Sequence, residues 1–81
     1  MKLNQTIEMM KSEDYDVRFR AEYYQVKIRA EKLNNLLERY RNNTLDFTPK
    51  CSYEMLSNQL MTMQLYKQIL EGRAIIEGIV L

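Results

Sequence analysis

The sequence predicts an all-α protein, in which a short N-terminal helix precedes a long antiparallel helical hairpin and the chains assemble into a homo-oligomer. Two long segments carry apolar residues at helical spacing, and the only proline, Pro49, lies between them. With 2 Gly and 1 Pro in 81 residues, the chain has too few turn residues for a β-sandwich or barrel. So short a chain forms one small core, and 1 Cys with no His provides neither an internal disulfide nor a Cys/His zinc site. Association of copies, or very close helix packing, must supply the remaining stability.

The chain is expected to be a single helical-hairpin domain, residues 1–81, with an N-terminal arm over 1–12 and helices over 14–42 and 52–79. In the arm, Leu3, Ile7 and Met10 fall on one face of a short helix. A helix of this length does not persist alone in water, so it must dock on another element. The cluster from Ser12 to Asp14 is typical of a helix start.

The second segment holds the strongest periodic signal in the chain, a row of apolar residues with alternating spacings of four and three. We interpret this row as the stripe that packs against the other arm of the hairpin. Its members are Phe19, Tyr23, Val26, Ala30, Leu33, Leu37 and Tyr40. Tyr24 and Ile28 lie on the opposite side of the same helix, which is unusual for a solvated face. Either the N-terminal arm or another copy should cover that side.

The third segment follows a loop, in which Leu45 and Phe47 are expected to plug the end of the hairpin. Ser52 is a suitable N-cap for the last helix. The apolar side chains of this helix spread over an arc of about 220°, which is wider than one neighbouring helix covers. A second copy is the simplest additional partner. The apolar end, residues 75–81, is expected to be buried at a subunit interface.

Charge and composition exclude several classes of function. The net charge is only +1, from 12 basic and 11 acidic residues, which argues against long nucleic acid as a partner. No apolar run is long enough for a membrane span or a signal peptide, and the lone Cys51 is consistent with the cytoplasm. The sequence has no His, no phosphate-binding glycine loop and no nucleophile motif. We therefore expect a binding or assembly protein rather than an enzyme, with no cofactor and no metal.

Residues 15–29, which have a helical pattern, combine aromatic and basic side chains within four turns. Arg and Lys hold phosphates, and aromatic rings stack on bases, so a small, flat, anionic ligand clamped between copies is one interpretation. The alternative is that these residues only flank the core, with their charged ends in water. Arg73 lies within the apolar arc of the last helix and needs an anion or Glu77 as its partner. The candidate ligand-binding residues are Tyr15, Arg18, Tyr23, Lys27, Arg29 and Arg73.

Two patterns carry a resemblance to a known group of proteins. The first is Asp14-Tyr15-x-x-Arg18-Phe19-x-Ala21-Glu22-Tyr23-Tyr24-Gln25, and the second is Gln59-Leu60-x-x-Met63-x-x-Tyr66-x-x-x-Leu70-Glu71-x-Arg73-Ala74-x-x-Glu77-Gly78-Ile79. Together they resemble small phage and prophage proteins of the crAss-related helical-hairpin type. That group is similar to the anti-CBASS and anti-Thoeris sponges.

The resemblance implies a phage homohexamer in the host bacterial cytoplasm. Such a protein binds the cyclic nucleotide signals of bacterial immunity (cyclic di- or trinucleotides, or cyclic ADP-ribose isomers) between its subunits and does not cleave them. Five residues match that group as an aromatic and basic segment near the start of the long helix: Tyr15, Arg18, Tyr23, Lys27 and Arg29. Arg73 matches an Arg near the end of the second helix. Two alternatives remain: a structural helical oligomer, or an adaptor whose Met-rich last helix binds a host protein.

Overall fold

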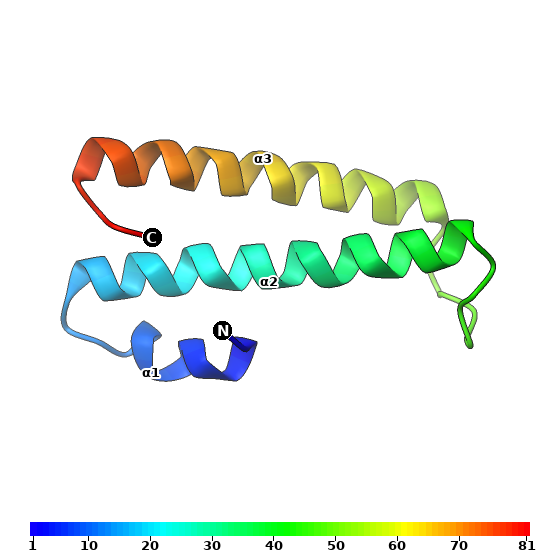
Figure 1. Cartoon of the computed structure of the whole chain (residues 1–81), viewed down its shortest axis with the longest axis horizontal. Helices are drawn as coiled ribbons and strands as arrows, with labels where there is room; N and C mark the ends of the chain where they lie inside the picture. Colours follow the sequence, from blue (N-terminus) through cyan, green and yellow to red (C-terminus); the bar gives the residue numbers. More distant parts are fainter.

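A computed structural model describes all residues, 1–81, and confirms an all-helical chain with no strand. A short 3₁₀ helix, η1 (Leu3–Gln5), leads into α1 (Thr6–Met10); α2 (Tyr15–Arg41) and α3 (Tyr53–Glu77) then form a hairpin. The molecule is elongated, 43 × 24 × 16 Å, with the arm and α3 on opposite sides of α2 (Figure 1). No helix has the length and apolar character needed to cross a membrane.

The N-terminal arm covers the side of α2 that carries Tyr24 and Ile28, as the first of the two alternatives predicts. Thr6 of this arm is 1% exposed, and its hydroxyl donates to the Leu3 carbonyl oxygen at 2.7 Å. The Gln25 amide nitrogen of α2 donates to the same hydroxyl oxygen at 3.1 Å. This polar pair anchors a five-residue helix that would not hold its shape alone.

Helix α2 begins and ends at residues that satisfy its free backbone groups. The Asp14 carboxylate accepts from the Asp16 amide at 2.9 Å and forms the N-cap. Arg18 Nη1 donates to the Ser12 carbonyl oxygen at 2.7 Å, which holds the turn between α1 and α2. At the other end, Asn43 adopts a left-handed conformation with φ 56°, which asparagine tolerates better than most residues.

The heptad-spaced row on α2 packs against α3 and forms the core of the hairpin. Five of its seven members are buried, while Leu33 and Tyr40 are half-buried. The main apolar cluster gathers at the open end of the hairpin, and its members are Phe19, Tyr23, Val26, Leu70, Ala74 and Ile79. The interpretation of this row as a core stripe is therefore confirmed.

Helix α3 ends in a left-handed glycine that returns the chain toward α2. The Ser52 hydroxyl caps the first turn by accepting from the Met55 amide at 3.1 Å, as predicted. Gly78 has φ 72°, and the Ile79 amide donates to the Ala74 carbonyl oxygen at 2.9 Å. Arg20 Nε donates to the Val80 carbonyl oxygen at 2.7 Å, so the last three residues lie along α2 (Figure 1).

Two expectations about apolar side chains differ from the structure. Phe47 is 53% exposed, so the prediction that it plugs the end of the hairpin is wrong. At the other end, Ile79 is buried within its own chain, whereas Ile75 and Ile76 are more than four-fifths exposed, at 83% and 85%. Burial of these two residues between subunits remains a prediction.

Candidate ligand-binding site

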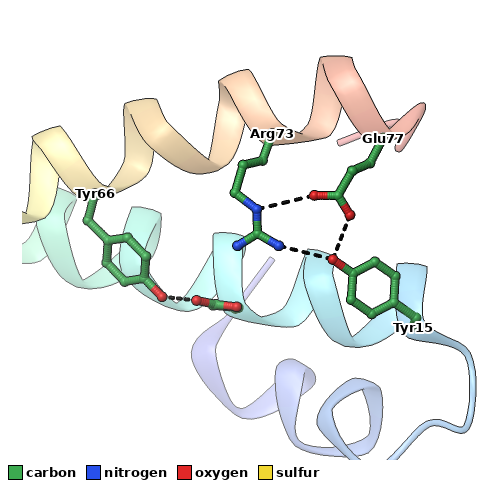
Figure 2. Close-up of polar contacts among 5 residues, drawn as sticks. Tyr15, Tyr66, Arg73 and Glu77 are labelled. Atoms are coloured by element: carbon green, nitrogen blue, oxygen red, sulfur yellow. Dashed lines mark hydrogen bonds and ion pairs between the residues drawn. The ribbon is translucent and has the colours of Figure 1, made fainter.

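Arg73 lies at the edge where α2 and α3 meet, in a closed ring of hydrogen bonds. Its Nε donates to Glu77 Oε2 at 3.2 Å, and its Nη2 donates to the Tyr15 hydroxyl oxygen at 3.0 Å (Figure 2). The Tyr15 hydroxyl in turn donates to Glu77 Oε1 at 2.6 Å. The guanidinium carbon also lies 5.0 Å from the centre of the Phe19 ring. Glu77 is therefore the partner that helical spacing predicts for Arg73, and Tyr15 and Phe19 complete the cluster.

The protonation equilibria in this cluster reflect its hydrogen bonds. The Tyr15 hydrogen bond holds the pKa of Glu77 below its usual value, and the Arg73 charge adds to this effect. The Glu77 carboxylate raises the pKa of Tyr15 by accepting its proton in a hydrogen bond. The same carboxylate raises the pKa of Arg73. At neutral pH the cluster thus contains a carboxylate, a guanidinium and a neutral phenol.

This arrangement leaves Arg73 able to bind a further anion. An arginine side chain has five N–H donors in a planar fork, and Nη1 of Arg73 makes no hydrogen bond within the chain. The side chain is 46% exposed, so an approaching ligand can reach it. Phosphate oxygens fit this fork, and the aromatic rings of Tyr15 and Phe19 lie next to it.

A second polar contact continues the same edge of the hairpin. The Tyr66 hydroxyl of α3 donates to Glu22 Oε2 of α2, on the Nη1 side of Arg73 (Figure 2). Tyr66 is 41% exposed. Glu22 was not among the candidate ligand-binding residues, although its position seven residues after Tyr15 places both on one face of α2.

The other candidate residues on α2 do not join the Arg73 cluster. Tyr23 is 6% exposed and donates to Glu71 Oε2 at 2.6 Å, so its hydroxyl holds the hairpin together. Burial is the main cause that raises the pKa of Tyr23 to about 12. Arg18 holds the turn before α2, as described above.

Lys27 and Arg29 lie nearer the N-terminal arm. The Lys27 ammonium is 5.9 Å from the centre of the Tyr24 ring, and Arg29 lines a pocket formed with α1. Eight residues of α-helix separate Phe19 from Lys27, which corresponds to about 12 Å along the axis. The six candidate residues therefore do not form one site. Tyr15 and Arg73 lie together, Tyr23 and Arg18 make separate structural contacts, and Lys27 and Arg29 lie beside the arm.

The comparison with known protein families is informative for this chain. The family model described as Sequestin matches residues 13–76, which include both long helices and the Arg73 cluster except for Glu77. No curated protein and no solved structure matches the chain. The structure contains no group of acidic, Cys or His side chains that could hold a metal ion. Since the match extends over most of the chain and both arms of the hairpin, this protein belongs to the Sequestin family.

Proposed function

We propose that the protein is a phage anti-defence protein that binds and sequesters a cyclic nucleotide immune signal in the host bacterial cytoplasm, without cleaving it. The observation that carries the proposal is the Sequestin match over residues 13–76, because the family name denotes the holding of a signal. The exposed fork of Arg73 beside two aromatic rings supports an anionic ligand with flat bases.

Sequestration acts through mass action alone. The protein must be present in excess of the signal and must bind it more tightly than the immune effector does. Two or three charge-assisted contacts on each phosphate, in a site enclosed by more than one copy, are compatible with nanomolar affinity. A single copy presents Arg73 on an open edge, so a second copy would be needed to enclose the ligand.

A row of exposed apolar residues on α3 supports assembly with a second copy. Its members are separated by four, four and seven residues, so they lie along one side of the helix, and they carry no charge. They are Met61, Leu65, Ile69 and Ile76, each more than half exposed. The chain exposes 5970 Å², whereas a compact monomer of its mass, 9.8 kDa, exposes about 5,200 Å². The difference is similar to the area of about 800 Å² that each partner buries in a standard interface.

Calorimetry with a panel of cyclic dinucleotides, cyclic trinucleotides and cyclic ADP-ribose isomers tests the proposed function. At least one compound should bind, and it should be recovered intact after denaturation of the protein. Arg73→Gln should weaken that binding. Arg41→Gln is a matched control, because Arg41 donates to the Tyr53 hydroxyl at 2.6 Å and lies over its ring at the far end of the hairpin. Absence of heat with every compound, from a folded protein, would contradict the proposal.

The same exposed row on α3 also favours one alternative, an adaptor that binds a host protein through this face. Sedimentation at micromolar concentration separates the two. A defined oligomer that Ile69→Lys disrupts supports assembly of copies. A monomer that acquires a protein partner, and binds none of the cyclic nucleotides, supports the adaptor.

A further inference from the structure

A groove runs around the N-terminal arm, on the side of α2 that faces away from α3. Its central pocket, of about 480 Å³, lies between η1 and α2. A pocket of about 390 Å³ shares Leu3 and Asn4 with it, and a smaller one of about 140 Å³ shares Met1 and Ile28. The three pockets therefore adjoin one another around the arm, and together we call them the arm groove.

The lining of the central pocket is half apolar and half polar. Met1, Leu3 and Ile28 supply the apolar surface, while Lys2, Asn4 and Lys32 supply ammonium and amide groups. Small-molecule sites have this composition and a volume of roughly 300–1,000 Å³. An occupant would therefore combine a flat or apolar body with an anionic group.

The charges around the arm groove are strongly unbalanced. Its walls include four cations and one carboxylate, and they are Lys2, Lys27, Arg29, Lys32 and Glu31. The three ion pairs of the chain join Lys11 to Glu8, Arg39 to Asp46 and Arg73 to Glu77. None of the groove cations has an acidic partner, in a protein whose net charge is only +1. Such a local excess attracts a multiply charged anion.

Helix α2 creates this arrangement through its own periodicity. Tyr24, Ile28 and Lys32 are spaced by four residues, so they follow one another along a single face. The arm docks on this face, so that Lys2 of the arm and Lys32 of α2 line the same pocket. Two lysines from different elements can thus approach the same anion, each as a point charge.

We infer that the arm groove binds a phosphorylated ring compound of the size of a nucleoside monophosphate. The phosphate lies between Lys2 and Lys32, and the ring rests on Leu3 and Ile28. This site is separate from the Arg73 cluster, because the arm and α3 lie on opposite sides of α2 (Figure 1). Lys27 and Arg29 line the two adjoining pockets, where their charges add to the attraction for an anion. The inference does not depend on the proposed function.

A titration of ¹⁵N-labelled protein with adenosine 5′-monophosphate, followed by amide chemical shifts, tests the inference. The nucleotide should shift amides of residues 2–4 and 28–32. Adenosine alone and inorganic phosphate alone should each produce weaker shifts at the same residues, since each supplies only half of the recognised groups. Shifts at none of these residues with millimolar nucleotide, or shifts confined to residues 73–77, would overturn the inference.

Variants then identify the phosphate contact. Lys32→Glu should weaken nucleotide binding by on the order of tenfold or more, because a repulsive charge replaces an attractive one. Lys32→Met, which preserves helix propensity and removes only the charge, should also weaken it. Lys50→Glu makes the same charge change at an exposed loop position and should have no effect. Unchanged affinity in both Lys32 variants would refute the site. Failure here leaves the cyclic nucleotide panel and its dependence on Arg73 intact, so the two proposals are separable.

Discussion

Tyr15 and Glu77 are 62 residues apart in the sequence, yet the Tyr15 hydroxyl donates to Glu77 Oε1 at 2.6 Å. This contact joins the first residue of α2 to the last residue of α3 and closes the open end of the hairpin. Because Glu77 also accepts from Arg73, it holds the guanidinium beside the Phe19 ring. The same carboxylate would compete with any anion that approaches Arg73.

We therefore predict that Glu77→Gln increases the affinity of the protein for an anionic ligand. The variant removes the negative charge next to Arg73 while an amide of the same size remains to accept from Nε. Calorimetry with inorganic phosphate, and with any cyclic nucleotide that the wild type binds, measures the change. Glu38→Gln on the exposed surface of α2 is the control and should leave affinity unaltered. A decrease in the Glu77→Gln variant would instead mean that the carboxylate is needed to orient Arg73.

A second prediction concerns alkaline pH and Tyr23. The native-state pKa of Tyr23 is raised to about 12 from an ordinary value of 10.0, so folding favours the protonated phenol. Its contribution to stability is present in full below about pH 10 and is lost as the pH rises toward 12. Tyr23→Phe should lower the free energy of unfolding at neutral pH by about 1 kcal/mol, through the lost hydrogen bond to Glu71.

Urea denaturation at pH 7, 10 and 11.5 checks this prediction. The variant should lose less stability than the wild type between the two higher values, since it has no phenol to ionise at this position. Tyr40→Phe is the control, because the Tyr40 ring packs against Tyr53 at the other end of the hairpin. Identical pH profiles for wild type and Tyr23→Phe would contradict the prediction.

Periodicity in the sequence was sufficient to predict the fold. The spacing of the row from Phe19 to Tyr40 determined which face of α2 is buried, and the capping residues Asp14 and Ser52 determined where the two helices begin. Phe47 was misjudged, because residues in an irregular loop have no periodicity from which burial can be predicted. The prediction for Ile79 was also incomplete, since the left-handed turn at Gly78 directs it into its own chain.

The candidate site was harder to predict, because chemical type alone does not place a side chain. Tyr15 and Arg73 contact each other across the hairpin. Such a contact is possible because both residues flank the core stripe. Tyr23 has the same chemistry as Tyr15, but it faces α3 and its hydroxyl is committed to Glu71. Lys27 and Arg29 belong to the same basic segment, yet helical rotation and the docked arm associate them with a different groove.

A third prediction tests the core at the open end of the hairpin. Leu70 is completely buried, at 0% exposure, and belongs to the cluster that contains Phe19 and Val26. Leu70→Ala should lower the free energy of unfolding by about 2–5 kcal/mol, which is most of the stability of so small a domain. Thermal denaturation followed by circular dichroism measures it. Gln68→Ala on the exposed surface of the same helix should change stability by no more than about 0.5 kcal/mol. Similar effects of both changes would argue against this packing.

The two glycines of α3 and its C-cap provide a matched pair for the last prediction. Gly78 has φ 72°, so Gly78→Ala forces a side chain into a left-handed conformation and should destabilise the protein by about 1 kcal/mol. Gly72 lies inside the helix, and an added Cβ would have no neighbour within 4 Å. Gly72→Ala should therefore stabilise the chain by about 0.5–1 kcal/mol, through improved helix propensity. Urea denaturation should show changes of opposite sign in the free energy of unfolding of the two variants, if α3 ends where the structure places it. Because Gly72 lies between Ile69 and Ile76 on the exposed row, a loss of stability in Gly72→Ala would contradict the prediction and would indicate that a second copy packs closely at this position.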